Sequence, residues 1–129
     1  MTGPATRLVT RVDIDDRANR GVVSIAARHE LELVTGGRIL LLSDRGWSSF
    51  GPGSSWAHMT VQEVQDTVRV VVGPDEPFKG YSHEDMEADH WNELQRIAVR
   101  QGVSVSAAEL QRLPHDVELS PRLRDRLQH

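Results

Sequence analysis

The sequence predicts an α+β fold, in which a small antiparallel sheet carries a long helix and two short C-terminal helices on one face. Apolar and polar residues alternate with a period of two through the first third of the chain, as in strands with one buried face. Helix-capping signatures dominate the last third. Because strands and helices occupy separate parts of a chain of 129 residues, we expect a single α+β domain over residues 1–129.

A three-strand meander is predicted over residues 6–43. Leu8 and Val12 fall on one side of the first strand, and from Val22 onward the odd positions keep one face of a second strand apolar. The pair Gly36-Gly37 supplies the positive φ angles of a tight hairpin, after which a short aliphatic run returns antiparallel. Strands joined by such short turns usually pair with their neighbours in the sheet.

The middle of the chain is predicted to form a loop, a short helix and a later strand. Glycine, proline and serine favour irregular structure over residues 44–58. Thr60 and Glu63 make a capping box that begins a short helix. The β-branched run over residues 68–72 then predicts a buried fourth strand.

Three helices are predicted in the C-terminal part of the chain. A capping serine opens a long helix over residues 83–101, which Gly102 ends. Its sparse apolar stripe predicts that it lies across the sheet with one face in water. Ser106 begins a short helix that Pro114 stops, and Ser120 caps the last helix.

The composition excludes several classes of function. The absence of cysteine removes iron–sulfur clusters, thiolate zinc sites and disulfides. A net charge of −4 without a lysine and arginine cluster argues against nucleic-acid binding. The longest aliphatic run, Ile39 to Leu42, is far shorter than the roughly 20 apolar residues of a membrane span, and no secretory signal is visible. We therefore expect a cytoplasmic protein without a membrane segment or a cofactor, whose oligomeric state the sequence does not indicate.

Acidic residues gather between positions 75 and 93, where a single lysine opposes them. The members that we expect to bind a partner are Glu84, Asp85, Glu87 and Asp89. An acidic patch of this kind steers and orients a basic protein partner. The alternative is that the helix dipole attracts acids to the N-terminal turn without any partner.

The loop over residues 44–58 carries large aromatic side chains. Trp47, Phe50, Trp56 and His58 are its candidate binding residues. Aromatic side chains on a loop line a ligand pocket or anchor a partner, because they offer a large contact area at low entropic cost. The alternative is that they fold inward and cap the core.

A metal site is weighed on the long helix, where His83, Glu87 and His90 share one face at spacings of four and three residues. Imidazole and carboxylate groups at such spacing bind zinc, iron or manganese. The sequence lacks both His-Glu-x-x-His and a second Glu-x-x-His, so a solvated helix face is the favoured interpretation.

No motif names a reaction. The serines lie outside a Gly-x-Ser-x-Gly elbow, and no phosphate-binding loop is present. His29 is interpreted as a hydrogen-bonded histidine at a bend in its strand. The favoured hypothesis is a non-enzymatic binding protein, such as an inhibitor or immunity-type partner, that uses the acidic helix face. The alternatives are a small-ligand-binding protein or small enzyme with a pocket between the sheet and the long helix, and a metal-binding protein.

Overall fold

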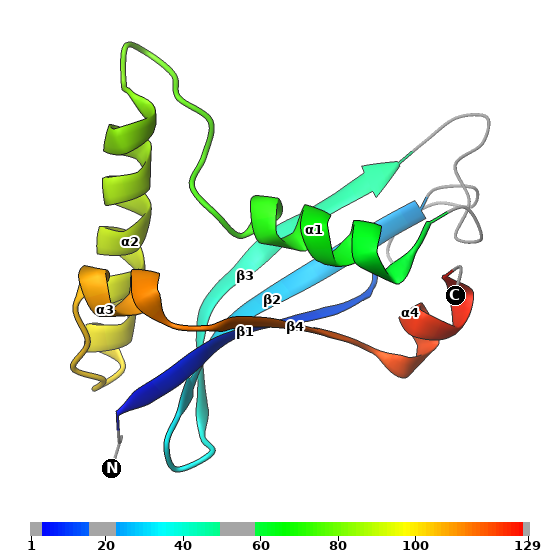
Figure 1. Cartoon of the computed structure of the whole chain (residues 1–129), viewed down its shortest axis with the longest axis horizontal. Helices are drawn as coiled ribbons and strands as arrows, with labels where there is room; N and C mark the ends of the chain where they lie inside the picture. Colours follow the sequence, from blue (N-terminus) through cyan, green and yellow to red (C-terminus); the bar gives the residue numbers. More distant parts are fainter. Residues whose placement is uncertain (1–3, 16–22, 50–58, 128–129) are drawn as a thin grey trace.

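The computed structural model describes residues 4–15, 23–49 and 59–127. Its elements, in chain order, are β1 (Ala5–Ile14), β2 (Val23–Leu33), β3 (Arg38–Ser49), α1 (Val61–Val71), α2 (His83–Arg100), α3 (Ala107–Arg112), β4 (His115–Leu119) and α4 (Pro121–Arg126) (Figure 1). The strands form one sheet in the order β3-β2-β1-β4. The predicted α+β class, with its meander, long helix and two short C-terminal helices, is confirmed.

The sheet is mixed, because β4 runs parallel to β1 while β1, β2 and β3 form the antiparallel meander. In the register of β1 and β2, Leu8 lies opposite Leu31 and Val12 opposite Ala27. This register places apolar side chains of both strands on the same face. The hairpin between β2 and β3 turns at Gly36, whose φ of 90° suits a residue without a Cβ atom.

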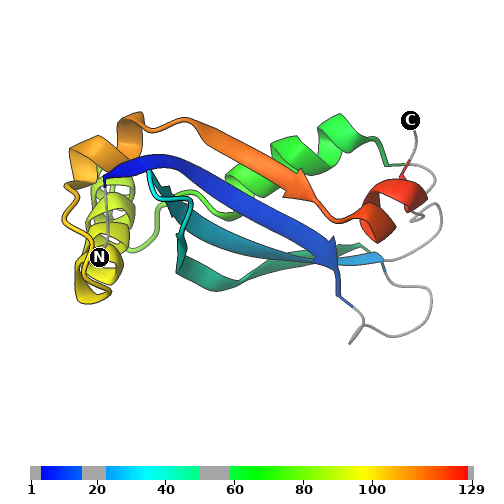
Figure 2. The same cartoon turned by 90° about the horizontal axis from the view of Figure 1, so that it is seen from below.

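The core divides into two clusters on the face of the sheet that the helices cover. At one end, Leu94 of α2 and Leu110 of α3 pack with residues of β1, β2 and β3. At the other end, Val64 of α1 and Leu123 of α4 pack with residues of β1 and β2. Figure 2 shows α1 along one side of the sheet and α2 at its end. The opposite face of the sheet therefore carries the charged residues of the strands.

Residues 68–72 are not the fourth strand, because the first four of them continue α1 and the last caps it. Val64, Val68 and Val72 are buried at helical spacing, whereas Val70 is 72% exposed. A period of three to four residues buries one face of a helix, and a strand would have buried alternate positions. Helical periodicity therefore prevails over the β-propensity of valine.

The fourth strand is β4, which the sequence analysis did not identify. Within it Val117 and Leu119 alternate with Asp116 and Glu118, so the period of two is present over only five residues. Residues 44–49, predicted as part of a loop, instead complete β3. They pair with the N-terminal half of β2, where Gly46 lies opposite Ala26.

Helix α2 begins at the predicted capping box, in which Ser82 and Asp85 bond reciprocally. It stands at one end of the sheet beside α3, and not across the sheet as predicted (Figures 1 and 2). Leu94 and Ala98 bury its inner face. Among the described residues, no helix is long and apolar enough to cross a bilayer.

Candidate functional site

The predicted acidic patch lies on the N-terminal half of α2, where Glu84, Asp85, Glu87 and Asp89 are all exposed. Two of these acids have structural roles. The Asp85 carboxylate accepts a hydrogen bond from the backbone N–H of Ser82 at 3.0 Å, and Glu87 accepts one from the Gln111 amide at 2.9 Å. Glu84 and Asp89 have no such partner within the described part of the chain. Glu84 lies in the first turn of α2, where the helix dipole favours an acid, whereas Asp89 lies beyond that turn.

An exposed aromatic pair, which the sequence pattern does not predict, precedes the acidic helix. Phe78 and Tyr81 are 52% and 51% exposed, and their ring centroids lie 5.8 Å apart. Between them, Lys79 and Gly80 have φ angles of 51° and 83°, and the Tyr81 N–H donates to the Phe78 carbonyl at 3.0 Å. Two successive positive φ angles are the signature of a type I′ turn. This turn brings the first and last side chains of the tetrapeptide together.

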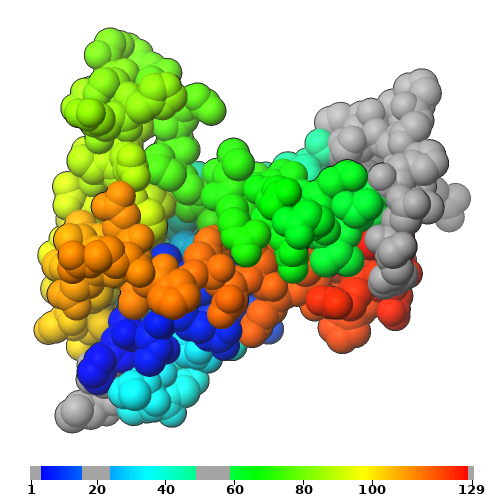
Figure 3. All heavy atoms as spheres, viewed as in Figure 1, coloured from blue at the N-terminus to red at the C-terminus, as the bar shows by residue number. Residues whose placement is uncertain are grey.

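The turn and the first turns of α2 project from one corner of the molecule, at the upper left of Figures 1 and 3. We call Phe78 and Tyr81, together with the four acids of α2, the acidic-aromatic corner. A positive φ at a residue with a Cβ atom costs about 1 kcal/mol or more and persists only where the surroundings hold it. Lys79 is the one such residue in the described ranges, and it lies at the centre of the aromatic pair.

The predicted aromatic loop is only partly described. Trp47 lies on β3, half-buried against the core cluster that contains Ile25 and Val64, which is the core-capping role. Phe50, Trp56 and His58 lie outside the described residues.

The candidate metal ligands are not brought together. His83 is exposed, Glu87 bonds to Gln111, and the half-buried His90 packs its ring edge-to-face on Trp91. Across residues 4–15, 23–49 and 59–127, no three histidines or acids are grouped as metal ligands.

A second candidate site is a pocket of about 250 Å³ between the sheet, the C-terminal end of α1, and α2. Three histidines from separate elements line it: His29 of β2, His90 of α2 and His115 of β4. We call this cavity the histidine pocket. The pairing of β2 with β3 shifts register at His29, while β2 continues through this residue as one strand.

Thr10 of β1 joins two of these histidines. Its hydroxyl oxygen lies 2.8 Å from His29 Nδ1 and 2.7 Å from His115 Nε2. A hydroxyl has one hydrogen, so at most one of these two ring nitrogens accepts from it. The other nitrogen must therefore carry a proton and donate to Thr10. The tautomers of His29 and His115 are coupled through this hydroxyl.

Burial keeps the three histidines neutral at neutral pH. The pKa of His29 is lowered to about 3, chiefly by burial and to a smaller extent by the nearby positive charges that His115, His90 and Arg45 can carry. Burial is also the main cause that lowers the pKa of His90 and of His115. Neutral imidazoles offer both a hydrogen-bond donor and an acceptor. The three histidines can therefore form hydrogen bonds with a ligand without adding charge to the pocket.

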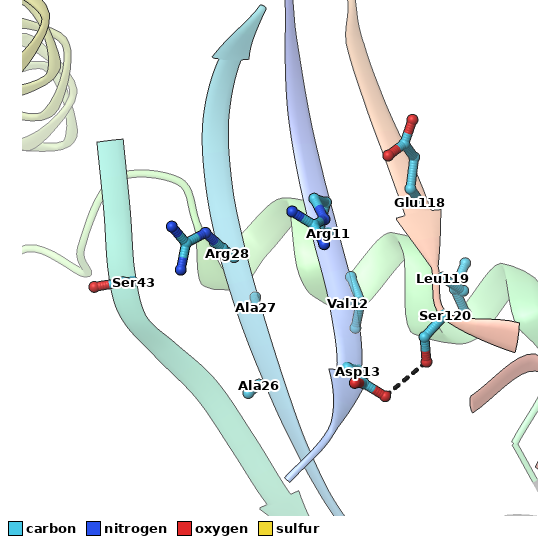
Figure 4. A pocket seen from close by; sticks show the side chains of 10 residues that line it. All are labelled: Arg11, Val12, Asp13, Ala26, Ala27, Arg28, Ser43, Glu118, Leu119 and Ser120. Carbon is cyan, nitrogen blue, oxygen red and sulfur yellow. Dashed lines mark hydrogen bonds between the residues drawn. The ribbon is translucent and has the colours of Figure 1, made fainter. Parts of the chain in front are cut away.

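The face of the sheet away from the helices holds a broader depression of about 450 Å³ (Figure 4). Arg11 and Arg28 face it from adjacent strands, and the Ser120 hydroxyl donates to Asp13 at 2.6 Å along its rim. Charges of both signs line this depression. It therefore shows less preference for one ligand charge than the histidine pocket does.

No protein-family model matches the chain, and no curated protein or solved structure is significantly similar to it. The function is therefore inferred from the geometry of these sites.

Proposed function

We propose that this protein is a non-enzymatic binding protein that engages a basic protein partner through the acidic-aromatic corner. The observation that carries the proposal is the exposed pair Phe78 and Tyr81 on a turn whose central lysine has a φ of 51°. Backbone strain at an exposed position is typical of sites that present side chains for recognition. An inhibitor or immunity-type partner acting in the cytoplasm is the form of binding protein that we favour.

The aromatic pair supplies the contact energy in this proposal. A phenylalanine or tyrosine has about 150–250 Å² of surface to bury, and half of that is still exposed here. At about 25 cal/mol per Å², covering the remaining area of one ring contributes roughly 2–3 kcal/mol. The turn holds both rings in place before binding, so little side-chain entropy is lost on association. These two side chains are therefore the expected anchors.

In this proposal the acids of α2 orient the partner and raise its association rate. Glu84 and Asp89 are exposed and unpaired within the described ranges, so their charges are available to a partner. Exposed charges at the rim of an interface mainly raise the association rate and weaken as salt rises. A partner with a positively charged surface is the one that this corner attracts.

The test compares the wild type, a double variant and a control variant as baits in a native lysate at low and high salt, with mass spectrometry of the retained proteins. The double variant carries Phe78→Ala and Tyr81→Ala. We expect the wild type to retain a basic protein that high salt releases and that the double variant does not hold. Val99→Ala is the matched control, because Val99 is 53% exposed elsewhere on α2. Equal retention by all three baits at every salt concentration would reject the corner as the binding site.

A second candidate function is the binding of a small ligand, and the histidine pocket favours it. That pocket lies at the junction of the sheet and α2, and His90 of α2 lines it. Trp47 does not line it. This candidate is compatible with partner binding at the acidic-aromatic corner.

A further inference from the structure

We propose that the histidine pocket is a binding site for a small organic carboxylate with an apolar body, with Arg69 and the Trp91 indole as its anchoring donors. The site is independent of the acidic-aromatic corner, and its test does not depend on any protein partner. Four features of the pocket support this assignment: the charge of its lining, one buried donor, the Thr10 hydroxyl that links His29 to His115, and its apolar walls.

The charge of the lining selects an anion. Its one charged residue is Arg69, and no carboxylate lines the pocket. Arg69 is exposed and makes no ion pair within the described part of the chain. Its charge nevertheless acts inside the pocket, because it contributes to the lowered pKa of His115. A guanidinium in this setting is suited to bind a carboxylate through two parallel hydrogen bonds.

Trp91, which lines the same pocket, carries a buried donor. The Trp91 indole Nε1–H is inaccessible to solvent and has no hydrogen-bond partner among the described residues. His90 packs edge-to-face on the indole, with ring centroids 4.9 Å apart, and so restricts its orientation. Leaving a buried donor without an acceptor is costly, and such groups call for an explanation. A carboxylate oxygen is an acceptor that would satisfy it.

The Thr10 hydroxyl, which links His29 to His115, allows the pocket to offer another hydrogen-bond donor without gaining charge. When His115 Nε2 accepts from the Thr10 hydroxyl, the Nδ1 of that neutral ring carries the proton, and His29 Nδ1 donates to Thr10. In the opposite arrangement His115 Nδ1 is an acceptor. A bound carboxylate near His115 would select the first arrangement, since an acceptor facing an acceptor is repulsive.

The apolar walls and the volume of the pocket determine what the rest of the ligand must be. Leu8, Val72, Pro74 and Leu113 line the pocket beside the polar groups. A volume of about 250 Å³ lies at the lower end for ligand pockets and suits a small molecule. A ligand of this size with one carboxylate and a compact apolar body matches both the donors and the walls.

The test is a titration of the ¹⁵N-labelled full chain with benzoate at pH 7, followed through the indole N–H signals. Trp91→Phe assigns the Trp91 signal, and the Trp47 signal is the internal control. We expect a saturable shift of the Trp91 signal, with a dissociation constant of about 1 mM for so small a probe. Arg69→Gln should weaken binding by about tenfold or more, as expected for the loss of a charge-assisted hydrogen bond.

Arg124→Gln is the matched control for Arg69→Gln, because Arg124 is exposed on α4 and does not line the pocket. It should leave benzoate binding unchanged. No saturable shift at about 50 mM benzoate, far above the expected dissociation constant, would overturn the proposal. So would equal weakening by the two arginine variants. Inorganic phosphate is the second probe, and binding tighter than that of benzoate would show that the pocket does not select a carboxylate with an apolar body.

Discussion

Arg11 and Arg28 lie directly opposite each other on β1 and β2, on the face of the sheet away from the helices. Like charges in this position repel and destabilise a sheet. The carboxylate of Glu30, the next outward-facing residue of β2, lies 3.1 Å from Arg28 and 3.9 Å from Arg11. Its side chain is only 7% exposed, and Arg38 approaches its other oxygen at 3.9 Å. Glu30 is therefore the shared counter-charge of the three arginines.

Replacing Glu30 by glutamine should destabilise the fold. The amide keeps the volume of the side chain but removes the counter-charge of Arg11 and Arg28, whereas Arg38 keeps its closer partners Glu32 and Glu118. We expect a loss of about 1–2 kcal/mol in the free energy of unfolding, less than for a fully buried ion pair because Arg11 and Arg28 are more than half exposed. Urea unfolding at pH 7 measures it. Glu76→Gln, at an exposed site, is the control, and equal stability of the two variants would contradict the role of Glu30.

Gly46→Ala should also destabilise the fold, because β3 passes close to β2 at this point. A Cβ atom on Gly46 would lie 2.5 Å from the backbone oxygen of Ile25, a contact that requires the strands to move apart. We expect a loss of roughly 1–3 kcal/mol, the usual cost of an overpacked contact, measured as a lower Tm.

Gly37→Ala is the control for that variant. The nearest atom to its added Cβ is the Thr35 hydroxyl oxygen at 3.6 Å, which is an ordinary contact. If Gly46→Ala unfolded at the temperature of Gly37→Ala, the close approach of the two strands would be wrong.

Gly46 also shows a feature of the fold that the local sequence pattern does not predict. Glycine among serines favours a loop, yet here glycine is the residue that lets two long strands approach. The meander and the capped helices were predictable because each depends on periodicity or on residues three positions apart. The run over residues 68–72 was assigned wrongly because β-branched valines suit both a strand and the buried face of a helix.

The candidate sites likewise include features that the local sequence predicts and features that depend on contacts between distant residues. The position of the acids on α2 was predictable, since a capping box marks where their helix begins. The exposure of Phe78 and Tyr81 depends on two backbone angles that composition does not reveal. The histidine pocket joins β1, β2, β4 and α2, and its linked residues Thr10 and His115 are 105 positions apart in the sequence. Only the paired strands bring these side chains together.

Lys79→Gly should stabilise the fold while leaving the turn in place. Glycine adopts a φ of 51° without the steric cost that lysine bears. We expect a gain of about 0.5–1 kcal/mol, reduced in part by the greater entropy of glycine in the unfolded chain. Chemical denaturation measures this gain. Gly80→Ala, where φ is 83°, is the opposite case and should lose stability. Loss of stability in both variants would show that Lys79 is not strained.

The lowered pKa of His29 should make the stability of the fold depend on pH. Its pKa is lowered to about 3 in the folded protein from an ordinary value of 6.5, chiefly by burial. Below pH 6.5 the unfolded chain therefore binds a proton that the folded chain does not. The stability contributed by neutral His29 is complete above pH 6.5 and is lost progressively as the pH falls toward 3. The slope from this one residue approaches about 1.4 kcal/mol per pH unit in that window.

The test compares the wild type with His29→Gln by urea unfolding between pH 7 and pH 4. Glutamine retains hydrogen-bonding capacity toward Thr10 but does not titrate. We expect the variant to be less stable at pH 7 and to lose less stability on acidification, with a slope that is shallower by up to one proton. A residual slope from His90 and His115 should remain, because burial lowers the pKa of both. Parallel curves for the two proteins would mean that His29 takes up its proton equally in the folded and unfolded states, and that it is not buried as a neutral ring.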